Sequence, residues 1–154
     1  MQEVYSLFDV SGKVALITGA TGGFGAAVSI GLARAGVKVM ATGRSEETLA
    51  PLVEKIREAG GTAAFVAGRP DRHDDVKRVV AETQKTYDGI DILITAAGVN
   101  KPGPITDQPL EEWKMIMDAN VKGTYLFCKE VGKVMIVQGR GGKVILLGSA
   151  RGEL

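Results

Sequence analysis

The sequence is poor in aromatic residues and carries almost no excess charge. Aromatic side chains make up 5% of its 154 residues, and the formal net charge is +1. A protein that binds nucleic acid through a basic surface or through stacked bases needs more of both, so we expect no nucleic-acid partner. No apolar run approaches the roughly 18 residues of a membrane-spanning helix, so we expect no membrane span.

Cysteine and histidine occur once each, as Cys128 and His73. A single thiol forms no internal disulfide, which is typical of a reducing compartment, and the N-terminus lacks the basic and apolar segments of a signal peptide. We therefore expect a cytoplasmic protein. His73 precedes Asp74 and Asp75, but adjacent residues on a helix point in different directions. We expect His73 to be a solvated residue and predict no metal site.

Glycine, by contrast, is concentrated in one stretch, residues 14–25, which reads VALITGATGGFG. A short apolar run long enough for one buried strand is followed by four glycines, and apolar residues then resume at helical spacing from Phe24. This pattern predicts a strand, a glycine turn and a helix. Such a turn directs backbone N–H groups and the positive end of a helix dipole at one point, where a phosphate can bind. Glycine is needed because a Cβ would block the approach.

Apolar strands and amphipathic helices alternate along the rest of the chain. We expect strands at 14–17, 37–42, 62–67, 90–95 and 143–147. We expect helices from the glycine turn to Gly36, at 46–59, at 71–87 and at 110–137, the last being either one long helix or a broken pair. Parallel strands need such crossovers. The predicted fold is α/β, a doubly wound (Rossmann-like), mostly parallel sheet of five strands with flanking helices, in a single domain. Ligands bind such sheets at the carboxyl ends of the strands.

Four spaced motifs at these positions resemble those of the short-chain dehydrogenases/reductases. The glycine turn at 18–25 is similar to the family's T-G-x-x-x-G-x-G, and 95–98 (TAAG) stands where the family usually has N-N-A-G. Residues 120–123 (NVKG) are similar to its N-h-x-G segment, and the strand ending at 148–149 (GS) is similar to the one that carries its serine. The resemblance covers the whole chain and implies a dinucleotide-binding domain over residues 1–154.

The resemblance implies hydride transfer between a nicotinamide cofactor and a small alcohol or carbonyl substrate. It implies that Ser149 holds the substrate oxygen and that Asn120 supports a proton relay. The cofactor-binding residues that we expect are Gly19, Thr21, Gly22, Gly23, Phe24, Gly25, Arg44, Arg69, Pro70, Ala97 and Gly98.

The end of the second strand favours NADP over NAD. An acidic residue there would bind the ribose hydroxyl and repel a 2′-phosphate. The chain has Gly43 followed by Arg44, and a guanidinium pairs well with phosphate oxygens. The alternative is that Arg44 is a solvated turn residue. Gly22 occupies the place where many NADP-using relatives carry a basic residue, and Arg69-Pro70 replaces the family's Asp-hydrophobic pair.

The family's catalytic Tyr-x-x-x-Lys lies about a dozen residues beyond the serine, whereas this sequence ends at Leu154. We interpret Tyr125–Lys129 as a chance match, because it precedes the serine. The sequence is therefore expected to be the cofactor-binding portion of such an enzyme, inactive alone. The alternatives are a nucleotide-binding module without turnover and another Rossmann-type enzyme such as a methyltransferase. The apolar surface of the 110–137 helix predicts a homo-oligomer.

Overall fold

The computed structural model describes residues 8–149, which form one parallel sheet with helices on both faces. The strand order is β3-β2-β1-β4-β5, and every neighbouring pair is parallel. The strands are β1 (Val14–Thr18), β2 (Lys38–Gly43), β3 (Ala63–Ala67), β4 (Ile92–Thr95) and β5 (Lys143–Leu146). The predicted doubly wound α/β fold is confirmed, with strand boundaries within two residues of those expected.

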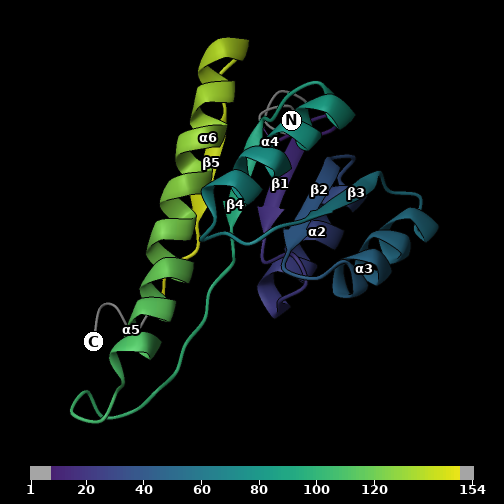
Figure 1. Ribbon diagram of the computed structural model, residues 1–154. Helices are drawn as coiled ribbons and strands as arrows, with labels where there is room; N and C mark the ends of the chain where they lie inside the picture. Colours follow the sequence, from purple (N-terminus) through teal and green to yellow (C-terminus); the bar gives the residue numbers. More distant parts are fainter. Residues whose placement is uncertain (1–7, 150–154) are drawn as a thin grey trace.

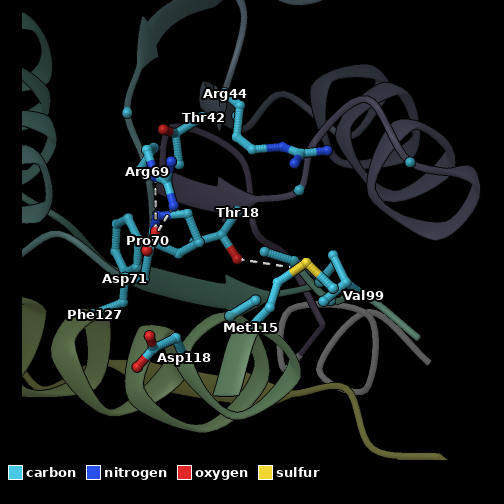
Figure 2. A pocket seen from close by; sticks show the side chains of 18 of the residues that line it. Thr18, Thr42, Arg44, Arg69, Pro70, Asp71, Val99, Met115, Asp118 and Phe127 are labelled. Atoms are coloured by element: carbon cyan, nitrogen blue, oxygen red, sulfur yellow. Dashed lines mark hydrogen bonds and ion pairs between the residues drawn. The ribbon is translucent and has the colours of Figure 1, made fainter. Parts of the chain in front are cut away.

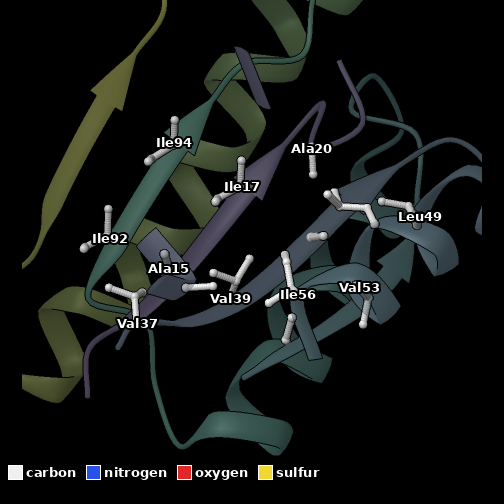
Figure 3. Packing of buried hydrophobic residues seen from close by; sticks show 14 residues of the cluster. Ala15, Ile17, Ala20, Val37, Val39, Leu49, Val53, Ile56, Ile92 and Ile94 are labelled. Atoms are coloured by element: carbon white, nitrogen blue, oxygen red, sulfur yellow. The ribbon is translucent and has the colours of Figure 1, made fainter. Parts of the chain in front are cut away.

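The helices cover the two faces of the sheet because the strand residues alternate between two cores. Ala15 and Ile17 of β1 join the core under α2 (Gly23–Arg34) and α3 (Glu46–Glu58), which Figure 3 shows. Leu16, between them, joins the core under α4 (His73–Tyr87) and α6 (Gly123–Gln138). All three side chains are fully buried, so β1 anchors both layers.

The helix expected at 110–137 is continuous, whereas the sequence analysis allowed either one long helix or a broken pair. Helix α5 (Leu110–Met117) runs through a π-helical turn, η1 (Asp118–Lys122), into α6, and the three form one rod beside β5 (Figure 1). A π turn holds one more residue than an α turn, so it rotates the side chains that follow it. Asn120 lies within this turn.

Two sequence-based expectations about side chains are wrong. Phe24, from which we counted the apolar face of α2, is 77% exposed, and the buried face is Gly25, Ser29 and Ala33. These small residues let the helix backbone approach the sheet closely. His73 is not a simple solvated residue, because its Nε2 lies 2.7 Å from Oε1 of the buried Glu130.

Strand β5 is an edge of the sheet within residues 8–149, and both of its faces are accessible. The exposed fractions of its apolar residues run from 45% to 56% for Val144, Ile145 and Leu146. Over this same part of the chain, no helix is both long and apolar enough to span a membrane.

Candidate functional site

A cavity of about 460 Å³ opens at the carboxyl ends of the strands, where the fold predicts a ligand site. Figure 2 shows side chains from all sides of it. The predicted cofactor residues that line it are Gly19, Thr21, Gly22, Arg44, Arg69, Pro70, Ala97 and Gly98. Gly23, Phe24 and Gly25 do not line it, nor do Asn120 and Ser149. Most of the predicted cofactor residues therefore gather in one place.

At two positions of the glycine turn the backbone lies so close to other backbone atoms that there is no room for a side chain. Gly19 has φ +60°, and a Cβ on it would lie 2.6 Å from Cα of Ala97. A Cβ on Gly25 would overlap the carbonyl of Gly19. Gly25 therefore keeps the turn compact while Gly19 brings it against the segment after β4. Helix α2 begins at this turn with no side-chain cap at Gly22, so its first N–H groups are left for a ligand.

Asn120 braces the segment that follows β4. Its Oδ1 accepts a hydrogen bond from the Val99 N–H (2.8 Å), and its Nδ2 donates to the Val99 carbonyl (2.9 Å). The Thr124 hydroxyl donates to the Asn120 carbonyl (2.8 Å). Both amide atoms are thus engaged with Val99, so the side chain fixes this wall of the cavity.

The segment between β3 and α4 forms another wall of the cavity. Arg69 makes a two-pronged ion pair with Asp71, with N–O distances of 2.8 and 3.1 Å, and its backbone N–H donates to Asp75. The hydrogen bonds from Arg69 lower the pKa of Asp71, so the carboxylate is ionised at neutral pH. The next residue, Pro70, packs against α6 so closely that a Cβ on Gly123 would lie 2.8 Å from it. The glycine of the N-h-x-G segment is thus explained by packing.

Arg44 lies on the cavity rim just after β2. Its guanidinium makes no hydrogen bond or ion pair with any residue of the 8–149 range, in contrast to Arg69. An unpaired guanidinium beside a cavity is well suited to an anionic ligand.

Several lining residues were missed by the sequence analysis. They are Thr18, Thr42, Asp71, Val99, Glu111, Lys114, Met115, Asp118 and Phe127, among others. Thr18, Thr42 and Asp71 lie at or just beyond strand ends, where the predicted fold binds ligands, but the sequence analysis named none of them as cofactor-binding residues. Those on α5 and α6 carry no such signal, because the sequence does not show how the helix crosses the sheet.

The remaining candidates do not line the cavity. Ser149 follows β5, is exposed and does not line the cavity. On α6, Lys129 Nζ lies over the ring of Tyr125, 5.9 Å from the ring centre. Neither residue lines the cavity. Partial burial raises the pKa of the Cys128 thiol, which fits a packing residue better than a nucleophile.

Comparisons with known proteins agree with this geometry. The family model described as short chain dehydrogenase matches residues 13–154. An uncharacterised oxidoreductase of Mycobacterium tuberculosis is 40% identical over 148 residues, which are 96% of this chain and 54% of that protein. Glucose 1-dehydrogenase of Gluconobacter oxydans is 37% identical over 137 residues, which are 88% and 52%.

A solved structure shows the same fold. The crystal structure of a short-chain type dehydrogenase/reductase from Mycobacterium marinum superimposes with a TM-score of 0.95 at 35% identity, covering 98% of this chain and 61% of that one. The chain spans about half the length of the curated relatives that it matches. The chain belongs to the short-chain dehydrogenase family, which uses a nicotinamide cofactor, NAD or NADP.

Proposed function

We propose that this chain supplies the cofactor half of an NADP-dependent oxidoreductase that transfers hydride between the nicotinamide and an alcohol or carbonyl substrate. The residues present fit a dinucleotide: the glycine turn admits a pyrophosphate where a Cβ would not fit, and the cavity extends to both sides of β1. The adenosine half would bind toward β2 and β3, and the nicotinamide toward β4 and β5, where Asn120 and Ser149 lie.

The observation that carries the choice of NADP is the unpaired Arg44. Neither of the residues directly after β2, Arg44 and Ser45, is acidic, and the Arg44 guanidinium has no internal partner within residues 8–149. Asp71, which lines the cavity after β3, is already paired with Arg69. A dianionic 2′-phosphate on the β2 and β3 side of the cavity would therefore meet the unpaired guanidinium of Arg44, while the carboxylate of Asp71 there is already paired.

Fluorescence titration with NADPH and NADH tests this proposal. We expect tighter binding of NADPH, and we expect Arg44→Ala to weaken NADPH at least tenfold while changing NADH less than threefold, because a charge-assisted hydrogen bond contributes about 1.5–3 kcal/mol. Arg34→Ala, an exposed arginine outside the cavity, is the matched control. Equal loss for both cofactors in Arg44→Ala would contradict the role in 2′-phosphate recognition.

The chemistry needs groups from both ends of the cavity. The bound cofactor supplies or accepts the hydride. By the family resemblance, the Ser149 hydroxyl would hold the substrate oxygen. Asn120 has its amide engaged by Val99, so we propose that its contribution is to fix the wall beside the nicotinamide. Family membership favours this reaction over a methyltransferase or a module without turnover.

The proton donor of the family, Tyr-x-x-x-Lys, has no counterpart after Ser149 in the printed sequence. We propose that a polypeptide of these 154 residues binds cofactor without efficient turnover. NADPH oxidation by this polypeptide with any ketone would contradict the proposal.

We also propose that the rod of α5, η1 and α6 pairs with a second copy. Its outer face carries an apolar stripe at four-residue spacing, Trp113, Met117, Val121 and Tyr125, each 36–60% exposed. A stripe of this kind favours burial against a partner helix. Light scattering should show a dimer or larger species for the wild type and a monomer for Val121→Lys. Lys77→Glu on the exposed side of α4 is the control.

A further inference from the structure

The proposed function leaves unused a buried polar group of the cavity wall, the hydroxyl of Thr42. Thr42 ends the buried run of β2, is 2% exposed and lines the cavity. Within residues 8–149, its Oγ1 is the only buried side-chain oxygen or nitrogen without a hydrogen-bond partner. Burying a hydroxyl without a partner destabilises a protein, so native structures rarely leave one.

Three other buried hydroxyls of the 8–149 range are paired, those of Thr18, Ser29 and Thr83. In β1, the neighbour of Thr42 in register, Thr18, accepts a hydrogen bond from the Ala97 N–H (3.2 Å). In the helices, Ser29 donates to the Gly25 carbonyl and Thr83 to the Val79 carbonyl, both at 2.7 Å. The Thr42 hydroxyl, on the cavity wall, differs from these three in having no partner within residues 8–149.

The surroundings of Thr42 suit a flat base. Its side chain lies on the same face of the sheet as Met40, the face that α4 and α6 cover. Figure 2 shows it on the side of the cavity where Arg69 and Pro70 lie, and Phe127 of α6 also lines the cavity. Apolar walls with one hydrogen-bonding group are the usual composition of a site for a heteroaromatic ring.

We propose that Thr42 is a specificity-determining residue for the cofactor, whose hydroxyl forms a hydrogen bond with the purine base of the adenosine half. A change to another staggered rotamer about the Cα–Cβ bond moves the hydroxyl to the position of the methyl group and the methyl group to that of the Cβ hydrogen. It sacrifices no hydrogen bond because the hydroxyl has none within residues 8–149. The inference rests on the proposed dinucleotide site. It adds a residue that neither the glycine turn nor the Arg44 argument involves.

The test compares Thr42→Val, which keeps the shape and removes the hydroxyl, with Thr42→Ser, which keeps the hydroxyl. We expect Thr42→Val to weaken NADPH and AMP about five- to tenfold, the value of one hydrogen bond, and to leave reduced nicotinamide mononucleotide unchanged. Thr42→Ser should bind within about twofold of wild type. The melting temperature of free Thr42→Val should rise by about 2–4 °C, because the unpaired hydroxyl is removed.

A purely structural threonine would behave differently. Thr83→Val is the matched control, since it removes a paired buried hydroxyl away from the cavity, and it should lower the melting temperature and leave AMP affinity unchanged. The inference would be overturned if Thr42→Val bound AMP with wild-type affinity, or if it lost affinity equally for AMP and for reduced nicotinamide mononucleotide. Either outcome would leave the Arg44 result standing. A wild type that binds neither dinucleotide would overturn both proposals.

Discussion

A buried carboxylate joins the two helices of one layer, and its removal should have a pH-dependent cost. Glu130 of α6 is 8% exposed. Its carboxylate accepts hydrogen bonds from Lys133 Nζ (2.8 and 2.9 Å), one turn along the same helix, and from His73 Nε2 (2.7 Å) at the start of α4. These bonds connect helices that otherwise meet through apolar contacts.

The size of the expected destabilisation follows from the pKa of Glu130. The hydrogen bonds from Lys133, and after them that from His73, lower the pKa of Glu130 from 4.5 to about 2. A carboxyl group whose pKa is lower in the folded state stabilises the fold above pH 4.5, and the stabilisation is lost as the pH falls toward 2. At about 1.36 kcal/mol per pKa unit the full shift is worth about 3 kcal/mol. The side chains of Lys133 and His73 are 59% and 38% exposed, so solvent screening reduces our expectation to about 1–2 kcal/mol.

Urea denaturation followed by circular dichroism measures this contribution. We expect Glu130→Gln to lower the free energy of unfolding by about 1–2 kcal/mol at pH 7, and by about half as much at pH 3.5, where part of the stabilisation is already lost. Glu82→Gln is the control, because Glu82 and Lys85 form an exposed pair at 3.6 Å, and it should cost less than about 0.5 kcal/mol. A cost for Glu130→Gln that is the same at both pH values would refute the reasoning.

Two further substitutions test the walls of the cavity. Gly25→Ala places a methyl group onto backbone atoms of the turn, so we expect a loss of about 2–4 kcal/mol in urea denaturation or a failure to fold, whereas Gly31→Ala, with open space around it, should be neutral or stabilising. Asn120→Ala removes both hydrogen bonds to Val99; we expect a loss of about 1–3 kcal/mol and faster hydrogen exchange of the Val99 amide. Unchanged exchange there would show that the segment after β4 is held by other contacts.

Much of the framework could be predicted from the sequence because it depends on local pattern. Apolar runs predicted the strands to within two residues, and the glycine turn was predicted because glycine allows a close approach that a Cβ would block. The site residues at strand ends, such as Arg44 and Arg69, followed from the topology. Local pattern also predicted that the cavity would lie at this edge.

What could not be predicted depends on contacts between distant segments. The pairing of His73 with Glu130 joins residues far apart in the sequence, and neither residue type indicates a partner. The π turn at Asp118–Lys122 contains Asn120, which bonds to Val99, and precedes Gly123, which lies against Pro70; both contacts join segments far apart in the sequence. Helix periodicity around Phe24 was misleading because small residues, rather than large apolar ones, form the buried face of α2.

The two ends of the cavity differ in how much of their wall is formed by residues 8–149. On the β2 and β3 side, Arg44, Thr42 and the Arg69–Asp71 pair already form a wall of defined charge and shape. On the β5 side, Val144 to Leu146 are about half exposed and Ser149 does not line the cavity. Substitutions on the first wall should therefore change cofactor affinity and the choice between NADPH and NADH, because the guanidinium that we propose to bind the 2′-phosphate lies there. Substrate preference should respond little to them, since Ser149, which we propose to hold the substrate oxygen, follows β5 and not β2 or β3.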